Sequence, residues 1–309
     1  MIKRALAERK IVKALDSFNP QILIGVGGYN EQKLFQKWTK KQGALYIPII
    51  VAKWPVPDNP VRKIIWKRGI SAITDPDIPV IFARGEFLKH YLAEEYNIPP
   101  DRIKVYWPKY PQELFTRTYT SPFEENKFNI LFAGRFSREK GVMLLPDILK
   151  LLIKDLPKTK LTLIGDGQLK NELRKKLREV SEEGKSWRIV GFLPQKEIIS
   201  YYKNCDALIV PSLCEGFGKV VYEGLMCGAW PVASDVDNIG YLIRDGIDGS
   251  LVSQIEPNEF VKKLIERNTQ GRKKNINNQY FKKMQNEYPS LTEALDEFLL
   301  HIEMGHNDK

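Results

Sequence analysis

Two residue types that build covalent or metal-bound frameworks are scarce in this sequence of 309 residues. There are three cysteines, an odd number without a Cys-x-x-Cys spacing, and three histidines. This scarcity argues against a disulfide-rich secreted domain and against a Cys/His zinc site. We therefore expect Cys205, Cys214 and Cys227 to belong to a protein of a reducing, cytoplasmic compartment. We also expect this protein to have no metal site.

Long apolar runs are also lacking. No run, Tyr46–Ala52 being among the longest, approaches the roughly 18–20 residues that a membrane-spanning helix needs. The chain opens Met-Ile-Lys-Arg-Ala, without the apolar segment of a secretory signal. These absences favour a cytoplasmic protein, either free or peripheral on the cytoplasmic face of the membrane.

Positive charge, in contrast, is plentiful and uneven. The formal net charge is +10; residues 1–121 hold 20 Lys and Arg against 11 Asp and Glu, whereas the remaining residues hold 28 against 27. Within the first part, the segment 61–69 places four cations around two isoleucines and a tryptophan. The basic character of the protein therefore belongs to its first part.

The segment 61–69 has two interpretations. It can lie on an anionic membrane surface, or meet an anionic acceptor, with its cations on phosphates and its tryptophan at the headgroups. It can equally be a solvated helix face, which is the commoner origin of a charge run. The first interpretation assigns contact residues Arg62, Lys63, Trp66, Lys67 and Arg68. No recognition motif accompanies the charge, so we expect no nucleic-acid partner.

The hydrophobic pattern alternates between strand-like and helical segments, which is typical of α/β domains with parallel sheets. In the first part we expect helices at 2–16, 31–41 and 85–96, an irregular proline-rich stretch at 54–77, and strands at 21–28, 45–52, 80–83 and 102–106. In the second part we expect helices at 141–154, 168–180, 196–203, 218–227, 257–268 and 291–302, and strands at 128–133, 160–164, 188–191, 207–210 and 231–234.

A polar stretch without a clear period, 116–126, separates the two series. We draw the domain boundary there, with an N-terminal domain at 1–121 and a C-terminal domain at 122–309. The last helix of the C-terminal domain is a candidate to pack back on the N-terminal domain. Five parallel strands with crossover helices predict a doubly wound sheet in the C-terminal domain.

The most informative stretch follows the strand at 207–210. It reads Pro-Ser-Leu-Cys-Glu-Gly-Phe-Gly and contains Glu215, with Glu223 eight residues later. Ligands of open parallel sheets bind beyond the carboxyl ends of the strands, and the free N–H groups of the following helix favour an anion there. Two carboxylates so spaced can hold two separate hydroxyl groups with a phosphate between them. The alternative is a solvated loop glutamate and an unrelated helix glutamate.

A second stretch, 130–141, comprises a strand, a Gly-Arg turn and a helix start. Arg135 offers a planar fork for phosphate oxygens and Lys140 a compact charge, so together they can neutralise a diphosphate. The alternative is a surface ion pair with Glu139.

Together these motifs resemble the retaining glycosyltransferases of the GT4-type, or group 1, family, which have the GT-B fold. The resemblance is strong from about 128 to 252 and weaker from 20 to 105, and Glu215 with Glu223 forms the family's E-x7-E pattern. The matching motifs are Ala133-Gly-Arg-Phe-Ser-Arg-Glu-Lys-Gly141, Leu163-Ile-Gly-Asp-Gly167, Val190-Gly-Phe-Leu-Pro194, Pro211-Ser…Glu215-Gly-Phe-Gly…Glu223 and Gly228-Ala-Trp-Pro-Val232.

The resemblance implies an α/β protein with two Rossmann-like, doubly wound domains facing a cleft, the N-terminal domain being shortened. It implies metal-independent, retaining transfer of a hexose from a nucleotide-diphosphate sugar to an acceptor hydroxyl, with no cofactor. The partners would be the nucleotide sugar and a carbohydrate or lipid-linked acceptor. The implied setting is synthesis of cell-envelope polysaccharide, glycolipid or glycoconjugate.

The resemblance also implies roles for individual residues. Arg135 and Lys140 would stabilise the leaving diphosphate, and Glu215 would bind the transferred sugar as the third catalytic residue. Glu223 would bind the ribose of the donor. The remaining donor-binding residues would be Gly134, Gly165, Gly191, Phe192, Gly216, Phe217 and Gly218. Asp235-Val-Asp237 matches the family's loop after a strand and not a metal site.

The sequence departs from the family at two places. Asp237, Asn238 and Tyr241 stand where a Gly-Gly pair and a glutamate are usual, and no histidine lies near residues 52–53, where many relatives carry one. With the shortened N-terminal domain, these departures keep open a non-catalytic, nucleotide-sugar-binding subunit that needs a partner chain to complete that domain. A sugar-nucleotide epimerase on the same fold is a second alternative, against which the E-x7-E spacing argues. An oxidoreductase is disfavoured because Asn30 replaces the third glycine of G-x-G-x-x-G.

Overall fold

The computed structural model describes residues 2–54, 56–111, 113, 119–271 and 286–307. The chain forms two compact units, the first made of residues 1–108 and 288–309 and the second of residues 109–287. Part of the expected boundary segment, residues 116–118, lies outside the described residues. Residues 109–121, which the sequence analysis places in the N-terminal domain, belong to the second compact unit.

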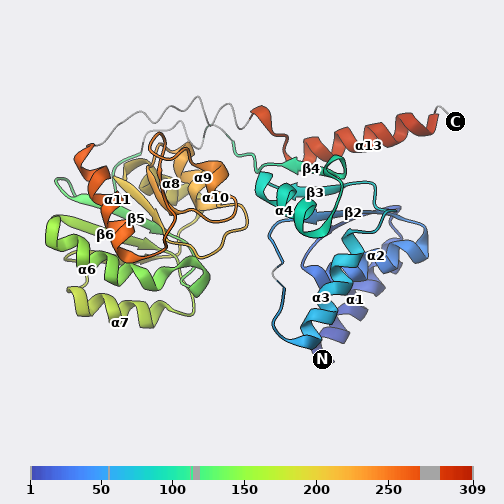
Figure 1. The fold of residues 1–309 in the computed structure, drawn as a ribbon, viewed down its shortest axis with the longest axis horizontal. Helices are drawn as coiled ribbons and strands as arrows, with labels where there is room; N and C mark the ends of the chain where they lie inside the picture. The colour runs from blue at the N-terminus through green and yellow to red at the C-terminus, as the bar shows by residue number, and fades with distance from the viewer. Residues whose placement is uncertain (1, 55, 112, 114–118, 272–285, 308–309) are drawn as a thin grey trace. The chain divides into compact units, whose positions relative to one another are not determined.

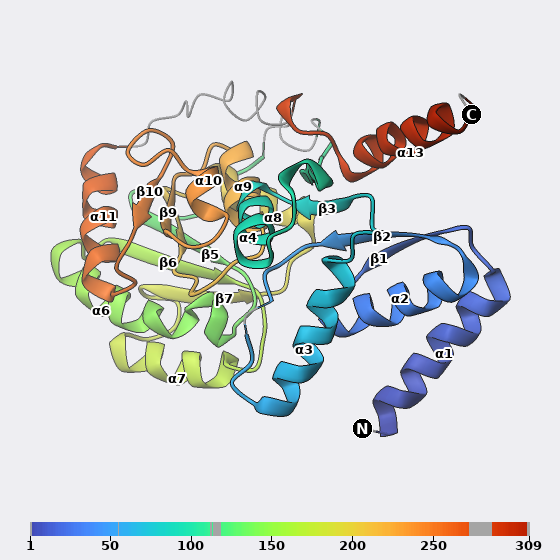
Figure 2. The same ribbon diagram turned by 45° about the vertical axis from the view of Figure 1, so that its right-hand side comes forward.

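The first unit is built on a parallel sheet of four described strands in chain order, β1 (Ile22–Val26), β2 (Leu45–Ile50), β3 (Ile81–Arg84) and β4 (Ile103–Tyr106). Its helices are α1 (Ile2–Phe18), α2 (Tyr29–Gln42), α3 (Pro60–Ile73), α4 (Glu86–Tyr96) and α13 (Leu291–Asn307). Figure 2 shows α2 and α3 on one side of the sheet and α13 on the other. Buried side chains of both faces form two clusters, one under α2–α4 and one under α13.

Helix α13 contributes Ala294 and Phe298 to the second cluster, where Phe298 meets Phe82 of β3 edge to face with ring centroids 6.2 Å apart. On β1, by contrast, the residues of this same sheet face remain open to solvent. Ile22, Ile24 and Val26 are 40–55% exposed, whereas Ile47 and Ile49 on β2, the register neighbours of Ile24 and Val26, are buried.

Helix α3 corrects the expectation of an irregular stretch at 54–77. Its N-terminus is capped by the Asn59 side chain, which accepts hydrogen bonds from the backbone N–H groups of Val61 and Arg62. Pro60 is the first helical residue, where its missing N–H costs no hydrogen bond and its fixed φ suits the helix. Proline content therefore marked the start of a helix here rather than the absence of one.

The second unit contains a parallel sheet of six described strands in the order β10-β9-β8-β5-β6-β7. The strands are β5 (Phe128–Ala133), β6 (Thr159–Ile164), β7 (Trp187–Gly191), β8 (Ala207–Val210), β9 (Pro231–Ser234) and β10 (Ser250–Val252). The sequence pattern predicts five strands and does not predict β10, because three residues are too short for a periodic signal. The chain adds β6 and β7 on one side of β5 and β8–β10 on the other, so the winding reverses between β5 and β8.

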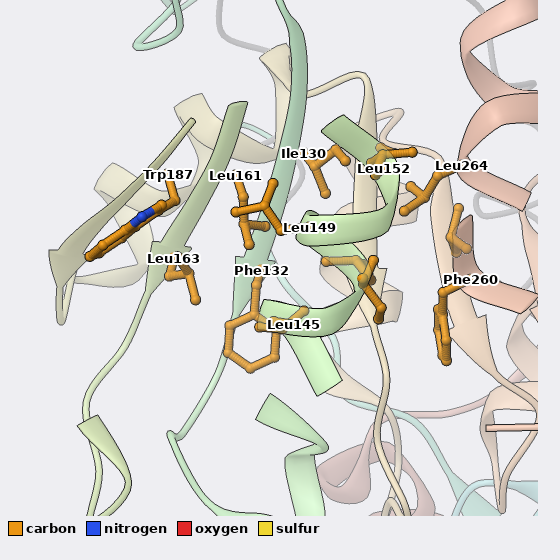
Figure 3. Close-up of a cluster of buried hydrophobic side chains, with 14 of the residues drawn as sticks. Ile130, Phe132, Leu145, Leu149, Leu152, Leu161, Leu163, Trp187, Phe260 and Leu264 are labelled. Carbon is orange, nitrogen blue, oxygen red and sulfur yellow. The ribbon is translucent and has the colours of Figure 1, made fainter. Parts of the chain in front are cut away.

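Helices cover both faces of this sheet, as Figure 1 shows. The helices on one face are α6 (Leu145–Asp155), α7 (Lys170–Val180) and α11 (Pro257–Thr269), and they share a buried core with alternate residues of the strands (Figure 3). The opposite face carries α8 (Gln195–Asn204) and α9 (Lys219–Met226), while the short helix α10 (Ile239–Leu242) follows β9. Since both faces are covered, β5, β6, β8 and β9 are buried throughout.

Candidate functional site

The candidate site lies where the winding of the second sheet reverses. Strands β5 and β8 are direct neighbours, and their carboxyl ends continue into the loops 134–141 and 211–218. Crevices of this kind, beyond the strand ends at a switch point, are the usual ligand sites of open α/β sheets. Both loops carry residues that the sequence analysis singled out.

The two loops are held against each other by their backbones. The Leu213 N–H donates to the Glu139 carbonyl at 2.8 Å. Gly141 has φ +62°, and a Cβ placed on it would lie 1.7 Å from the Pro211 carbonyl oxygen. Only glycine permits this approach, because any side chain would both strain the backbone and collide with the facing loop.

The loops after β5, β6 and β7 are linked in the same way. The Gly134 N–H donates to the Ile164 carbonyl at 2.9 Å, and the Gly165 N–H donates to the Gly191 carbonyl at 2.8 Å. A Cβ on Gly165 would lie 1.9 Å from the Gly134 carbonyl oxygen. Among the glycines expected to bind the donor, Gly165 therefore allows the loops after β5 and β6 to pack closely at one edge of the sheet.

Lys140 and Glu215 form an ion pair across the two loops. The Lys140 Nζ lies 2.5 Å from Glu215 Oε1, and their side chains are 27% and 8% exposed. The Ser212 hydroxyl donates to the same carboxylate oxygen at 2.9 Å. The Glu215 backbone N–H donates to Asp237 Oδ2 at 2.7 Å. The catalytic candidates of the two stretches are therefore in direct contact, although 75 residues separate them in the chain.

Arg135 takes a different position. Its side chain is 73% exposed and lies 3.6 Å from the Glu139 carboxylate, as in the surface ion pair that was the alternative for this stretch. A bond from the Glu139 backbone N–H, together with the Ser137 hydroxyl and the Arg135 charge, lowers the pKa of Glu139. Arg135 nevertheless lines the cavity described next, so its guanidinium can reach a ligand there.

A cavity of about 530 Å³ opens beside these loops. Glu223 lies at its wall, is 5% exposed, and accepts hydrogen bonds from Gln195 Nε2 at 2.9 Å and from the Tyr202 hydroxyl at 3.4 Å. Lys219 Nζ is 3.5 Å from the same carboxylate. Burial, and then the charge of Glu223, raise the pKa of Tyr202 well above its ordinary value, so this phenol stays a neutral donor.

The predicted site residues take several different places in the structure. Those that line the cavity are Gly134, Arg135, Gly165, Phe192 and Glu223. Lys140 and Glu215 lie on the adjoining loops, and Gly191 joins Gly165 by the backbone bond given above. Gly216 and Gly218 belong to the loop that leads into α9, where Gly218 is the N-cap residue with φ +81°.

Phe217 is the member of the predicted set whose side chain turns inward. Its ring is buried and meets Tyr222 edge to face, with centroids 5.3 Å apart. Its carbonyl accepts a hydrogen bond from Asn238 Nδ2 at 2.9 Å. Phe217 thus anchors the loop in the core, and its ring is not among the residues that line the cavity.

Several residues that hold the site together were not predicted from the sequence. They are Gln195, Tyr202, Ser212, Lys219, Asp237 and Asn238. One signal was available in the sequence, because Gln195 and Tyr202 lie seven residues apart and so share a face of α8. The contacts of Asp237 and Asn238 had no local signal.

A second cavity, of about 430 Å³, lies at the opposite edge of the same sheet. Its lining includes Phe128 and Asp206, which lie where β5 and β8 begin, together with Arg267 of α11. Because ligands of such sheets bind beyond the carboxyl ends of the strands, we take the cavity that contains Glu223 as the candidate site.

The basic segment of the first unit lies on α3. Arg62, Lys63, Lys67 and Arg68 are exposed, as both interpretations required. Trp66 is half-buried, packs with the core under α2–α4, and donates its indole N–H to the Trp54 carbonyl at 2.9 Å. Its ring is therefore committed to the interior of the first unit.

Within the described residues, none of the helices combines the length and the apolar character that crossing a bilayer requires. The same residues contain no cluster of three or more His, Cys, Asp or Glu side chains suited to a metal ion. None of Cys205, Cys214 and Cys227, all of them described residues, forms a disulfide bond.

Comparison with known proteins adds to this geometry. An uncharacterized glycosyltransferase of Methanocaldococcus jannaschii is 34% identical over 145 residues, which are 47% of this chain and 39% of that protein. D-inositol 3-phosphate glycosyltransferase of Paenarthrobacter aurescens is 29% identical over 182 residues, 56% of this chain and 45% of that protein. The chain therefore spans less than half the length of these relatives.

Solved structures share the fold. HepE of Anabaena, crystallised with UDP, superposes with a TM-score of 0.77 at 16% identity, covering 95% of this chain and 82% of that one. Its complex with UDP-glucose gives a TM-score of 0.76. The fold is therefore GT-B, an α/β fold with two parallel sheets. The profile of the family "Glycosyl transferases group 1" matches residues 119–284, more than half of the chain and nearly the whole second unit, so the chain belongs to this family.

Proposed function

We propose that the chain is a retaining, metal-independent glycosyltransferase that moves a hexose from a nucleotide-diphosphate sugar to an acceptor hydroxyl. The observation that carries the proposal is the contact of Lys140 with Glu215 beside the cavity walled by Arg135 and Glu223, at the switch point of the sheet. Family membership and the UDP and UDP-glucose complexes of HepE support it.

In this proposal the donor lies across the carboxyl ends of β5 and β8. Glu223, held by Gln195, accepts hydrogen bonds from the ribose hydroxyls, and Glu215 accepts them from the hexose. The bond between the anomeric carbon and the diphosphate breaks, its electron pair leaves with the diphosphate, and the acceptor oxygen bonds to the same face of the sugar. The acceptor proton passes to the departing phosphate oxygen.

Arg135 and Lys140 stabilise the charge that builds on the leaving diphosphate. Fixed cations aimed at a developing anion are among the largest contributions to catalysis. Lys140 contacts Glu215 in the structure. In this proposal, donor binding gives each of them a new partner, phosphate for Lys140 and a sugar hydroxyl for Glu215.

We place the reaction in the cytoplasm, in the synthesis of cell-envelope polysaccharide, glycolipid or glycoconjugate. The acceptor in this proposal is a carbohydrate or a lipid-linked molecule.

The test combines donor binding with turnover. A thermal-shift panel of nucleotide diphosphates and their sugars should single out one donor, since a ligand at about 100 times its Kd adds roughly 2.7 kcal/mol to stability. The selected donor is then incubated with acceptor extracts, and the anomeric configuration of the product is read by NMR. Retention with chelator present is the expected result. Inversion, or activity that disappears on chelation, would overturn the corresponding part of the proposal.

A partner-dependent subunit is the second candidate, and β1 favours it. The outer edge of β1 has no strand partner among the described residues, and Ile22, Ile24 and Val26 are exposed on one face. Parallel sheets are normally covered on both faces and protected at their edges.

A photo-crosslinking residue at position 24 would capture a partner chain that covers β1 in cells. Turnover by the purified chain alone would exclude this candidate, whereas donor binding without turnover, together with a single crosslinked polypeptide, would support it.

A further inference from the structure

We propose that the exposed face of α3 docks on an anionic phospholipid surface. The face consists of Val61, Ile64, Lys63, Lys67 and Arg68. It lies in the first unit, and its lipid binding is measured without any substrate, so the inference stands apart from the proposed transfer reaction.

The face combines apolar side chains with cations. Val61 and Ile64 are 66% and 55% exposed, and Lys63, Lys67 and Arg68 are exposed beside them. On a helix, Ile64 is one turn from Val61, Lys67 and Arg68, so the apolar pair is flanked by positive charge. Residues 60–73 include no Asp or Glu. Val56, just before the helix, is another exposed apolar residue, at 53%.

The orientation of α3 about its own axis is fixed by contacts on the side opposite the exposed face. Ala72 and Ile73 are fully buried. At Gly69 a Cβ would lie 2.2 Å from the Tyr29 carbonyl oxygen, so α3 and the start of α2 are in close contact. The bond from Trp66 to the Trp54 carbonyl adds a polar anchor on the inner side. Val61 and Ile64 cannot turn inward without breaking this packing.

The chemistry of the face selects a lipid surface over a nucleic acid. Cations alone would serve a phosphate backbone, which binds through charge. A bilayer interface also offers an apolar layer below the phosphates, and an interfacial helix fills it with apolar side chains. Val61 and Ile64 supply these, while Lys63, Lys67 and Arg68 are complementary to anionic headgroups. Trp66, the headgroup candidate from the sequence, contributes to the anchoring of the helix instead.

The experiment is flotation of the purified full chain with phosphatidylcholine vesicles, with and without about 30% phosphatidylglycerol. The wild type should float with the anionic vesicles only. Lys67→Ala/Arg68→Ala should weaken partitioning about 30-fold, given the usual contribution of each cation near a charged bilayer. Val61→Ser/Ile64→Ser should weaken it as well, and the remaining binding should then be abolished by salt. Lys175→Ala/Lys176→Ala on α7 removes the same charge from an exposed helix of the second unit and should change nothing.

Three outcomes would overturn the proposal. Equal flotation of the wild type and the α3 charge variant is one, and equal loss in the α7 control is another. The third is a wild type that does not float with anionic vesicles but binds a single-stranded RNA oligonucleotide, while the α3 charge variant does not bind that RNA. Circular dichroism and the Tm of each variant separate lost binding from lost folding, and these exposed substitutions should leave both unchanged.

Discussion

The carboxylate of Asp237 accepts the backbone N–H of Glu215 at 2.7 Å, and so ties the loop after β9 to the loop that carries a proposed catalytic residue. Asp237 adopts a left-handed backbone conformation, with φ +49°, which Asp tolerates better than most residues. The next residue, Asn238, is buried and bonds the Phe217 carbonyl. Asp237 and Asn238 stand where a Gly-Gly pair is usual in the family. Their side chains form two hydrogen bonds with the loop 211–218 that glycines could not form.

We expect Asp237→Gly to lower kcat without unfolding the protein. Glycine accepts the left-handed conformation but offers no acceptor to Glu215, and a small misplacement of a catalytic group can cost ten- to about a hundredfold in rate. Asp237→Asn keeps an acceptor oxygen and should retain most of the activity. The measurement is kcat together with Tm. Equal activity of the Gly variant and the wild type would show that the Asp237 bond does not position Glu215.

Arg135→Ala and Lys140→Ala should each lower kcat by about 10²–10³, because each removes a fixed cation from the leaving diphosphate. Their stabilities should differ. Lys140→Ala also leaves the buried Glu215 carboxylate without its ion pair, at a cost of roughly 1–3 kcal/mol, whereas Arg135 is largely exposed. Arg138→Ala, on the same short helical turn, is the matched control and should preserve both the rate and the stability. A wild-type rate for Arg135→Ala would contradict the proposed role.

Glu223→Ala should mainly raise the KM for the donor, since ribose contacts are made in the ground state and the transition state alike. Gln195→Ala should move KM in the same direction by less, because it removes one of the donors that orient Glu223. Glu197→Ala, an exposed carboxylate on α8, serves as the control. Initial rates at varied donor concentration separate the two constants, and a loss confined to kcat would argue against a ribose-binding Glu223.

Local pattern was enough for most elements of the fold. The bounds expected for β5, β8 and β9 coincide with the observed ones, since these strands are short, mainly apolar and flanked by turn residues. The position of Glu215 and Lys140 beyond strand ends also followed from the sequence. Their contact did not, because it depends on β8 lying beside β5, which is a property of the strand order and not of either segment.

Two further features could not be predicted from the local sequence. The inward turn of Trp66 is decided by the Trp54 carbonyl, twelve residues earlier, while charge content had suggested an outward ring. The bond from Glu215 to Asp237 joins two loops that follow different strands. In both cases the deciding partner is remote in sequence, so composition and period carried no information about it.

Gly141→Ala should destabilise the second unit by more than about 2 kcal/mol. A left-handed conformation costs an alanine roughly 1–2 kcal/mol, and the added Cβ would also collide with the Pro211 carbonyl. Gly246→Ala is the matched control, because Gly246 has φ +74° with no atom within 4 Å of the added Cβ. Urea unfolding of both variants isolates the collision from the backbone strain. Equal losses in the two would show that the loops 134–141 and 211–218 can separate without cost.

Asp75 should make the first unit sensitive to acid. Its carboxylate lies 2.6 Å from Lys40 Nζ and also accepts a hydrogen bond from Gln36. Burial alone raises the pKa of Asp75, but the bonds from Lys40 and from the Asp77 backbone N–H outweigh it and lower the pKa below its ordinary value.

A carboxyl whose pKa is lower in the folded protein than in the unfolded chain stabilises the fold at neutral pH. That stabilisation is complete above the unfolded pKa and is lost as the pH falls through the folded pKa. Asp75→Asn should therefore be less stable than the wild type at pH 7 and should differ less from it in strong acid. Asp58→Asn, an exposed carboxylate before α3, is the control and should follow the wild type at each pH. Urea midpoints measured across the acid range test this, and a constant gap between Asp75→Asn and the wild type would contradict the assignment.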